Sequence, residues 1–362
     1  MTISAPDSKV RIIKAYVRPN KLNDVRDSLE RRLKELGREF GMIATEVRGH
    51  GTEQGFSAIY RGQLYNVLLL PKYEIEMAVP EGIGDEVRRV IIEAARTGEK
   101  GDGRITWQPA DGFAAIRTFD GLHLDNISAD AYYLITAVVR PNKVDDVKDA
   151  LVGIGHFGMN VTEVRGHGHQ KGHTAFYRGQ EYNVSLLPKM QIQMVMQASK
   201  VLEAYDAILK AARTGEVGDG RIWLTLVDEY TRIRTGEVLY SNVPLNASED
   251  ILQRIIVRPN KVDDVQDALK KIPETENVGM TVTELRGSGH QKGHTAVYRK
   301  EEYRVSLIPK MQIDLVIPRY LSDVVQKAVI NAARTGEVGD GKIWKYGVDE
   351  FARIRDGQRQ AA

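Results

Sequence analysis

Regular alternation of apolar and polar residues marks out the predicted strands. From Tyr303 to Ile317 the odd positions are mostly apolar and most of the even positions are polar, and the pattern returns from Tyr182 to Met196. This period of two predicts a long strand with one buried face. A proline inside such a strand cannot donate to the ladder, so we expect a bulge or an edge at Pro71, Pro188 and Pro309.

Two helices are predicted in each stretch of about 120 residues. The first begins after an asparagine with an aspartate three residues on, which resembles an N-cap in the pairs Asn260/Asp263 and Asn142/Asp145. Its apolar stripe is Val262, Val265, Leu269 and Ile272. The stripe of the second helix is Leu321, Val324, Val325, Ala328, Val329 and Ala332.

The order of these elements predicts an α+β fold. Further strands are expected at VRIIKAYVR (10–18), at MTVTELRG (280–287) and after a glycine-rich turn, with the last strand ending in RIR. The resulting β-α-β-β-α-β order is the ferredoxin-like plan, in which two helices cover one face of a four-stranded sheet. The other face of the sheet then needs a partner.

Internal repetition supplies that partner. VRPNK begins at Val17, Val139 and Val257, so the chain holds three copies, which we call modules 1, 2 and 3. We expect three ferredoxin-like domains that pack their open sheet faces together as a single-chain pseudo-trimer. The predicted division is a tail (1–9), module 1 (10–118), a connector (119–130), module 2 (131–236), a connector (237–250), module 3 (251–357) and a tail (358–362).

Composition narrows the class of protein. The formal net charge of +2 argues against a protein that coats nucleic acid. With no cysteine, disulfides, thiolate zinc sites and cysteine nucleophiles are excluded. No apolar stretch has the length of a membrane span, and the polar opening MTISAPDSK does not resemble a secretory signal. We therefore expect a soluble protein located in the cytoplasm.

The glycine-rich turn is the first candidate site. It reads GEKGDGR (98–104), GEVGDGR (215–221) and GEVGDGK (336–342). Glycines let backbone amides converge on an anion and the final cation adds charge, although a turn without a ligand is the plain alternative. An isoleucine stands where a P-loop has its magnesium-binding Ser or Thr, and the order is helix, loop, strand, so a P-loop NTPase is rejected.

Two further features carry charge or length. Arg353 and Arg355, like Arg232 and Arg234, alternate on one strand face and suit a phosphate clamp, with a solvated charged edge as the alternative. A long hydrophilic segment runs over 166–189 and 287–310, and loops of that length usually bind something. Its histidines 167, 169 and 173 lack acidic or cysteine co-ligands, so we interpret them as ordinary loop residues rather than metal ligands.

These motifs resemble a known family. GMTVTELRGSGHQKGH, YR..EY, a lysine after proline, TGEVGDGKI and RIR follow each other in the order and spacing of PII signal-transduction proteins, over essentially all of each module. The resemblance implies a homotrimer-like assembly that binds ATP or ADP between neighbouring subunits and 2-oxoglutarate beside ATP through magnesium. It also implies a long loop that docks onto targets such as ammonium channels and nitrogen-assimilation enzymes.

The resemblance also implies roles for individual residues. The lysine and glutamine matching the 2-oxoglutarate site are Lys72, Lys189, Lys310, Gln170 and Gln291, and the two glutamines also match the magnesium ligand. The tyrosines matching a nucleotidylated position are Tyr182 and Tyr303, for which simple packing is the alternative. The implied nucleotide-binding residues are Gly49, Gly51, Gly101, Gly103, Arg104, Arg117, Gly166, Gly168, Thr214, Gly218, Asp219, Gly220, Arg221, Arg232, Arg234, Thr281, Gly287, Gly289, Thr335, Gly339, Asp340, Gly341, Lys342, Arg353 and Arg355.

Module 1 departs from the pattern. Glu53 and Gln54 replace the glutamine and lysine of the loop, and Ala115 replaces the first arginine of the pair. The threonine at 281 is an isoleucine at 43 and an asparagine at 160, so three unequal clefts are expected.

The resulting prediction is a non-enzymatic sensor whose loops regulate partner proteins. One alternative is a sensor of adenine nucleotides or another small anion without a 2-oxoglutarate response. The other is a phosphotransfer enzyme, against which stands the lack of a convincing general base beside the glycine turn.

Overall fold

The described part of the chain covers most of each module. The computed structural model describes residues 10–38, 41–50, 56–60, 63–67, 70–110, 112–115, 117, 128–155, 158–167, 173–177, 180–184, 186–232, 234–241, 249–275, 278–288, 294–298, 301–305, 308–348, 350–353 and 359–361. In 50, 56–67, 112–115, 167, 173–184, 288, 294–305, 350–353 and 359–361 the description covers the backbone alone.

Each module builds the same unit of four strands and two helices. Module 1 contains β1 (Val10–Val17), α1 (Leu22–Glu35), β2 (Met42–His50), β5 (Leu70–Pro80), α2 (Gly84–Ala95) and β6 (Arg104–Ala110). Its antiparallel pairings run in the order β6, β1, β5, β2. This is the predicted ferredoxin-like topology, in which the first and third strands lie side by side at the centre.

Modules 2 and 3 repeat the arrangement. Module 2 contains β8 (Tyr132–Val139), α3 (Val144–Val152), β9 (Met159–His167), β12 (Leu187–Gln197), α4 (Ala198–Ala212) and β13 (Arg221–Val227). Module 3 contains β16 (Asp250–Val257), α5 (Val262–Lys270), β17 (Met280–Ser288), β20 (Ile308–Pro318), α6 (Ser322–Ala333) and β21 (Lys342–Val348). The strand orders are β13, β8, β12, β9 and β21, β16, β20, β17.

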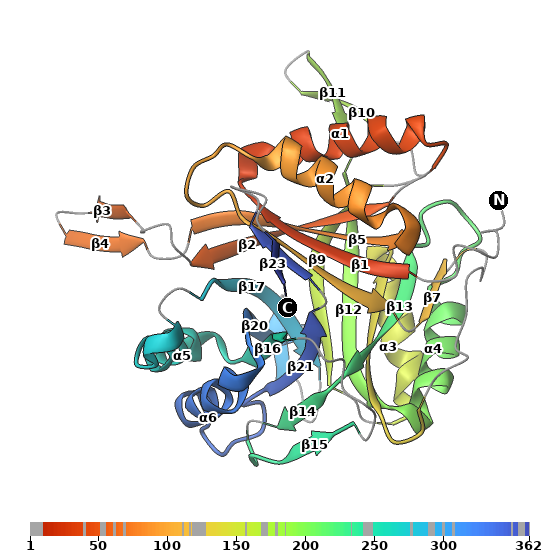
Figure 1. Ribbon diagram of the computed structural model, residues 1–362. Coiled ribbons are helices and arrows are strands. Elements are labelled where there is room, and N and C mark those ends of the chain that lie inside the picture. The colour runs from red at the N-terminus through yellow and green to blue at the C-terminus, as the bar shows by residue number, and fades with distance from the viewer. Residues whose placement is uncertain are drawn as a thin grey trace.

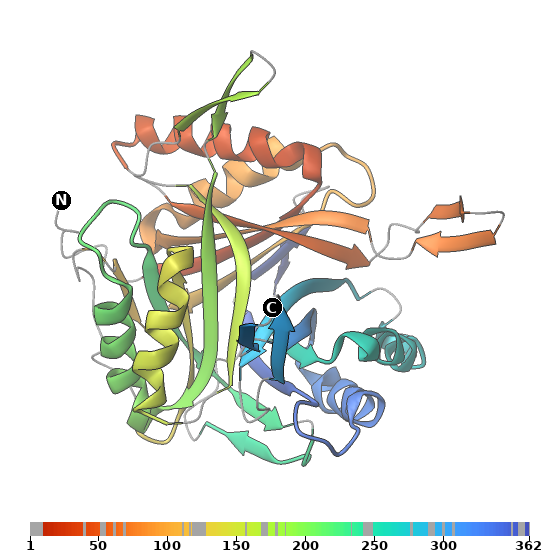
Figure 2. The same cartoon turned by 180° about the vertical axis from the view of Figure 1, so that it is seen from behind.

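The helix pairs lie on the outside and the sheets face inward, as Figures 1 and 2 show. Alternation along β1 explains this layering. Ile13, Ala15 and Val17 pack under α1 and α2 in the core of module 1, whereas Ile12 joins an apolar cluster shared with module 2. Each sheet is therefore buried on both faces, and the second face is covered by the other modules.

Strand pairing between modules closes the assembly. The second strands of the modules form a triangle, because β2 pairs with β9, β9 with β17 and β17 with β2. A short strand near the end of each module also crosses to the next module: β7 (Gly112–Ala115) pairs with β13, β14 (Glu229–Arg232) with β21, and β22 (Glu350–Arg353) with β6. These links, together with β15 (Val238–Tyr240), which pairs with β14, and β23 (Arg359–Ala361), which pairs with β22, give one 17-stranded sheet.

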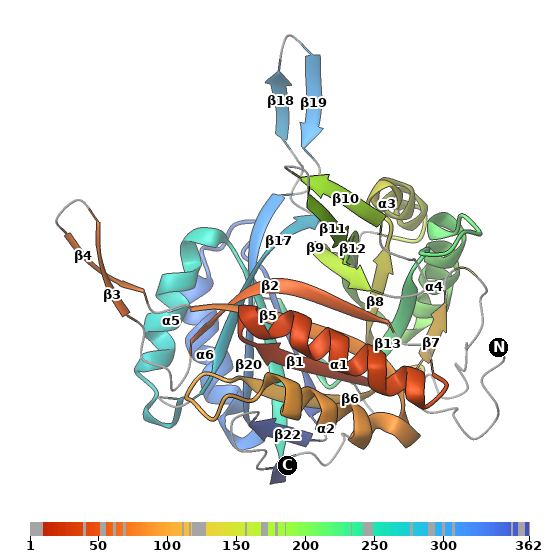
Figure 3. The ribbon, with the colours of Figure 1, turned by 90° about the horizontal axis from the view of Figure 1, so that it is seen from above.

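The long strand predicted from Tyr303 to Ile317 is two strands. The hairpin strand β19 (Glu301–Val305) pairs with β18 (His294–Tyr298), and β20 belongs to the body. Equivalent hairpins are β3 (Phe56–Tyr60) with β4 (Gln63–Val67) and β10 (His173–Tyr177) with β11 (Gln180–Val184). Figure 3 shows two of these hairpins projecting from the body. The alternation continues through both strands, so the break between them leaves no mark in the pattern.

Pro309 lies at a local edge, which was one of the two predicted outcomes. It pairs with Arg286 of β17, while pairing of β20 with β16 begins only at Met311, so the missing amide donor disturbs no bond on that side.

The N-cap prediction is wrong. Asn260 lies inside a 3-10 turn (Pro259–Lys261), and Lys261 occupies the cap position of α5 with no side-chain cap bond. The preceding proline favours this turn because its ring presets φ for a first helical turn. Val324 is also misplaced, since it is exposed on α6 while Val325 and Val329 face the core. In the described part of the chain no helix is long and apolar enough to span a membrane.

Candidate ligand-binding clefts between modules

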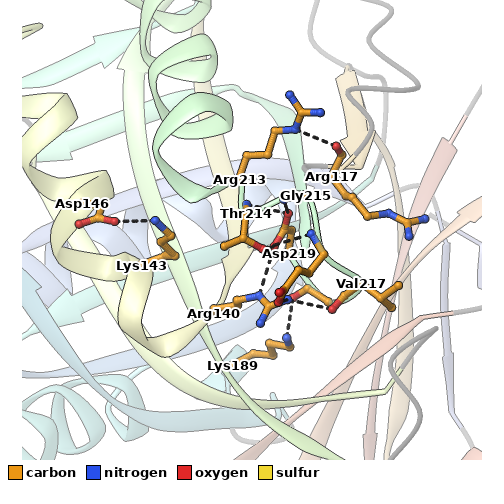
Figure 4. A network of polar contacts seen from close by, with 12 residues as sticks. Arg117, Arg140, Lys143, Asp146, Lys189, Arg213, Thr214, Gly215, Val217 and Asp219 are labelled. Atoms are coloured by element: carbon orange, nitrogen blue, oxygen red, sulfur yellow. Dashed lines mark hydrogen bonds and ion pairs between the residues drawn. The ribbon is translucent and has the colours of Figure 1, made fainter.

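Each glycine-rich turn is held by a buried aspartate at its centre. In module 2 the Asp219 carboxylate accepts hydrogen bonds from the backbone amides of Thr214 and Gly215, both 2.8 Å, and from the Thr214 hydroxyl. Figure 4 shows these bonds converging on the carboxylate. Burial would raise the pKa of Asp219, but the bonds from Thr214, Gly215 and Arg140 outweigh it and hold the pKa below its usual value. Asp102 and Asp340 do the same in the other modules.

Sequence reasoning missed a second residue that organises the turn. The arginine of VRPNK, Arg140 in module 2, donates to Asp219 Oδ1 at 3.1 Å and to the carbonyl of Val217 at 2.9 Å. Arg18 repeats both bonds with its own turn, whereas Arg258 donates to the carbonyl of Val338 at 3.1 Å and forms an ion pair with Asp340 at 3.4 Å. The signal was present, because the motif recurs unchanged in all three modules, but its partner lies about 80 residues away in sequence.

The last glycine of the turn is required by space as well as by conformation. Gly220 has a φ of 102°, and a Cβ there would lie 1.7 Å from the carbonyl oxygen of Val138. Gly341 meets the carbonyl of Ile256 in the same way, at 1.8 Å. Only glycine lets the turn lie against the first strand of the sheet at this positive φ.

The lysines at the base of the long loop point at the turn of their own module. Lys72, Lys189 and Lys310 each donate from Nζ to a turn carbonyl at 2.6 Å, that of Gly101, Gly218 and Gly339 respectively. Burial, followed by the neighbouring Arg140, lowers the pKa of Lys189, and burial with Arg258 does so for Lys310.

The glycines predicted to hold phosphate on the adjoining strand make room for these lysines. A Cβ on Gly166 would lie 2.9 Å from Lys189 Cγ, and one on Gly287 would lie 3.2 Å from Lys310 Cγ. Gly49 lies against Lys72 in the same way.

The cation that ends each turn reaches into the preceding module. Lys342 donates to the carbonyl of Gly158 at 2.6 Å, and Arg221 donates to that of Gly41 at 3.4 Å. Arg104 donates to the carbonyl of Gly279 at 2.8 Å and to the hydroxyl of Thr281 at 3.1 Å. The expected clefts would therefore each lie between the turn of one module and the second strand of the module before it.

The register of the crossing strands decides which arginines face which turn. Arg232 lies opposite Lys342, Arg353 opposite Arg104, and Ala115 opposite Arg221. Arg232 of module 2 thus lies beside the turn of module 3, and the backbone of Arg353 of module 3 lies beside the turn of module 1. Beside the turn of module 2 stands Ala115 of module 1, with Arg117 two residues further on. Arg117 also accepts a bond at its carbonyl from Arg213 Nε, 3.0 Å (Figure 4).

The cations already have partners inside the protein. Arg232, 51% exposed, forms an ion pair of 2.7 Å with Glu237, and Arg234 is exposed beside it in sequence. Lys342 Nζ also lies 5.6 Å from the centre of the Trp344 ring. An anion in the module 2/module 3 cleft would compete with Glu237 and Gly158 for these two cations.

The equivalent second-strand residues Ile43, Asn160 and Thr281 have different surroundings. Ile43 packs with Val138 and Trp223 of module 2, and Thr281 accepts from Arg104. Asn160 is buried, and within the described residues its Nδ2 has no hydrogen-bond partner. This one position therefore has a different environment in each module.

The remaining predicted site residues either have other roles in the turns or lie outside the described side chains. Thr214, Thr335, Asp219 and Asp340, expected at the nucleotide, use their side chains within the turns. For Tyr182, Tyr303 and Arg353 only the backbone is described. Outside the described residues lie Gly51, Glu53, Gln54, Gly168, His169, Gln170, Gly289, Gln291 and Arg355. The described side chains contain no cluster of three or more metal-binding groups.

Comparison with known proteins gives the family. The model of the family "Nitrogen regulatory protein P-II" matches residues 10–119, 132–237 and 252–358. The chain belongs to this family. A P-II protein of Azospirillum brasilense is 53% identical over 103 residues, which are 28% of this chain and 92% of that protein. One from Synechocystis sp. is 52% identical over 103 residues, again 28% and 92%. One P-II module therefore matches nearly the whole length of each relative.

A solved structure is also similar to part of the chain. It is the crystal structure of Arabidopsis thaliana PII bound to citrate, 30% identical, covering 31% of this chain and 86% of that one, with a TM-score of 0.25. P-II proteins are regulators of nitrogen metabolism rather than enzymes, and this chain carries three P-II modules.

Proposed function

We propose that the protein senses ATP or ADP together with 2-oxoglutarate and Mg²⁺ in the clefts between modules. The observation that carries the proposal is the meeting of two modules at one cleft. There the turn of module 3, with Lys342 and Lys310, lies across from β14 of module 2, where Arg232 stands opposite Lys342. A glycine-rich turn with cations from two modules suits a nucleotide di- or triphosphate.

The three clefts would differ in what they bind. The module 2/module 3 cleft has both arginines, the complete turn and a loop with Gln291. The module 1/module 2 cleft keeps Gln170 but has Ala115 in place of one arginine, which weakens phosphate binding. The module 3/module 1 cleft keeps Arg353 but has Glu53 in place of the glutamine, which weakens 2-oxoglutarate binding by charge repulsion.

Binding would be read out by the hairpins that project from the body. Lys189 and Lys310 connect each hairpin to its turn, so a ligand that recruits the lysine also acts on the strands leading to the hairpin. The proposed partners are proteins of nitrogen assimilation, including an ammonium channel, and the proposed location is the cytoplasm. The ligand would shift loop populations by its differential affinity for them.

Calorimetric titration tests this function. We expect 2-oxoglutarate to bind only when Mg-ATP is present, and Lys310→Ala or Gln291→Ala to lower its stoichiometry. Lys327→Ala, an exposed lysine on α6 of the same module, is the matched control and leaves binding unchanged. Binding of 2-oxoglutarate without nucleotide, or no binding of it at all, contradicts the 2-oxoglutarate assignment.

The same titrations separate the other two functions. Nucleotide binding without any 2-oxoglutarate response supports a sensor of adenine nucleotides or another small anion, which the changed loop of module 1 favours at that one cleft. Sustained ATP turnover that disappears with Lys342→Ala supports a phosphotransfer enzyme.

A further inference from the structure

A cluster of buried charges lies where the three sheets meet. The same cross-strand pair occupies this place in each module: Lys14 with Glu76 in module 1, Thr136 with Gln193 in module 2 and Arg254 with Asp314 in module 3. All six residues are buried, with Lys14 2% and Arg254 1% exposed. The position is equivalent in the three folds, but its chemistry differs in each module.

Contacts within the cluster join different modules. Arg254 forms two bonds with Asp314, Nε to Oδ1 at 2.7 Å and Nη2 to Oδ2 at 2.6 Å, and its Nη1 donates to Gln193 Oε1 of module 2 at 3.0 Å. Gln191 of module 2 donates from Nε2 to Glu76 Oε2 of module 1 at 2.9 Å. The neutral amides of module 2 thus bridge the charged groups of modules 3 and 1.

Module 1 does not balance its own charge at this place. Lys14 Nζ lies 3.6 Å from Glu76 Oε1 and 3.8 Å from Glu74 Oε1, so one ammonium faces two carboxylates. Burial raises the pKa of Glu74, against the lowering effects of Lys14 and of Arg254 from module 3. Three copies of module 1 would bury twice as many carboxylates as ammonium groups, which is costly without further cations.

Three copies of module 2 would leave a buried charge unpaired at a different place, the seam formed by the crossing strand. Glu229 of module 2 is buried in the seam with module 3, where it lies 2.7 Å from Lys345 Nζ. At the equivalent register Leu224 of module 2 lies opposite Gly112, and Trp107 of module 1 lies opposite Glu350. In a set of three module 2 units Glu229 would face Leu224, leaving a buried carboxylate unpaired.

We propose that these buried residues make the sheet faces selective for one another, so that the assembly accepts one copy of each module and rejects sets built from module 1 or module 2 alone. The partner that each open face fits is therefore the other two modules of this chain, not the same module of a second chain. Module 3, whose Arg254 and Asp314 balance each other, is the unit on which the other two depend. The connectors keep the three modules close to one another, and the buried residues determine which modules pack together.

The test uses the full chain with protease sites inserted within 119–127 and 242–248. Unlabelled and ¹⁵N-labelled protein are cut at both connectors, mixed, unfolded in urea, refolded together and examined by native mass spectrometry. We expect modules 1 and 2 to appear only in assemblies that contain one of each module, labelled or unlabelled at random. Assemblies with two or three copies of module 1 or module 2 at statistical proportions, or modules that stay dispersed, overturn the proposal.

A variant that carries the residues of module 2 throughout the buried cluster tests the opposite case, in which modules no longer discriminate. Its changes are Lys14→Thr, Glu74→Gln, Glu76→Gln, Arg254→Thr and Asp314→Gln. We expect assemblies with repeated module 1 to appear in this variant. The matched control removes exposed charges instead, through Lys143→Thr and Asp146→Gln, which form an ion pair on the surface of module 2, and retains one of each module. If this cluster variant does not fold, the composition of the assemblies formed by the unaltered cut chain decides for or against the proposal.

Discussion

Lys342 of module 3 donates a hydrogen bond of 2.6 Å to the carbonyl oxygen of Gly158 in module 2, and it is only 8% exposed. Burial lowers the pKa of Lys342 from its usual 10.5 to about 7. Modules 1 and 2 have an arginine at this position, Arg104 and Arg221, in place of the lysine. The three clefts therefore differ in how their cation responds to pH.

Anion binding in the module 2/module 3 cleft should weaken as pH rises through about 7, because the neutral amine of Lys342 no longer attracts phosphate. The free energy of unfolding should change in the opposite direction. Between pH about 7 and 10.5 the unfolded lysine keeps a proton that the folded one has lost, so stability rises with pH in this range. Titration of ATP at pH 6 to 9 in buffers of different ionisation enthalpy measures the affinity and the proton uptake. Lys342→Arg is the control, and persistence of the same pH dependence in it contradicts the assignment.

Glu237 restrains Arg232, so Glu237→Gln should strengthen nucleotide binding in the module 2/module 3 cleft. The pair is half exposed and pairs of this kind contribute about 0–1 kcal/mol, which sets the expected gain at about two- to fivefold. Calorimetry with ADP and with ATP measures it. Glu203→Gln, which breaks the exposed pair with Lys200 on α4, should leave the affinity unchanged. Equal affinities for the parent and Glu237→Gln would show that Arg232 does not reach the ligand.

Two glycines of one turn should respond differently to alanine. Gly215→Ala places a Cβ in open space at a φ of 87° and should cost about 1–2 kcal/mol. Gly220→Ala adds the contact of 1.7 Å with Val138, so we expect a loss of more than about 3 kcal/mol and weaker nucleotide binding. Urea unfolding gives both values. Similar costs for the two substitutions would mean that the strand tolerates the clash by moving.

Gln253 is a buried polar residue in the middle of β16, and among the described residues neither of its amide atoms has a hydrogen-bond partner. The equivalent residues of modules 1 and 2 are Ile13 and Ile135. Gln253→Ile should stabilise the protein by about 1–3 kcal/mol, because an unsatisfied buried amide is removed. The shift of the urea midpoint measures this. Ile13→Gln is the reverse change in module 1 and should destabilise by a similar amount, and a destabilising Gln253→Ile would indicate that the amide has a structural role.

The secondary structure and the candidate residues were accessible from sequence because they rest on local periodicity and on motifs. Alternation around Ile313 and helical spacing around Val325 place those residues in the core as predicted. The errors fall where a neighbour overrides a local preference: Asn260 gives way to the proline turn, and the segment at 303–317 divides between a hairpin and the body. The role of Arg140 was hidden because its partner Asp219 is distant in sequence.

Sequence by itself determined the three-fold repetition, the ferredoxin-like order of elements and the glycine turns with their cations, since each depends on residues close together in the chain. Only the tertiary structure decided that Arg232 faces Lys342 and that Lys14, Gln193 and Arg254 share one buried place. These pairings depend on strand register and on the cyclic order of modules. Nothing in local periodicity encodes either, because a polar residue on an alternating strand has the same pattern whether it faces water or another module.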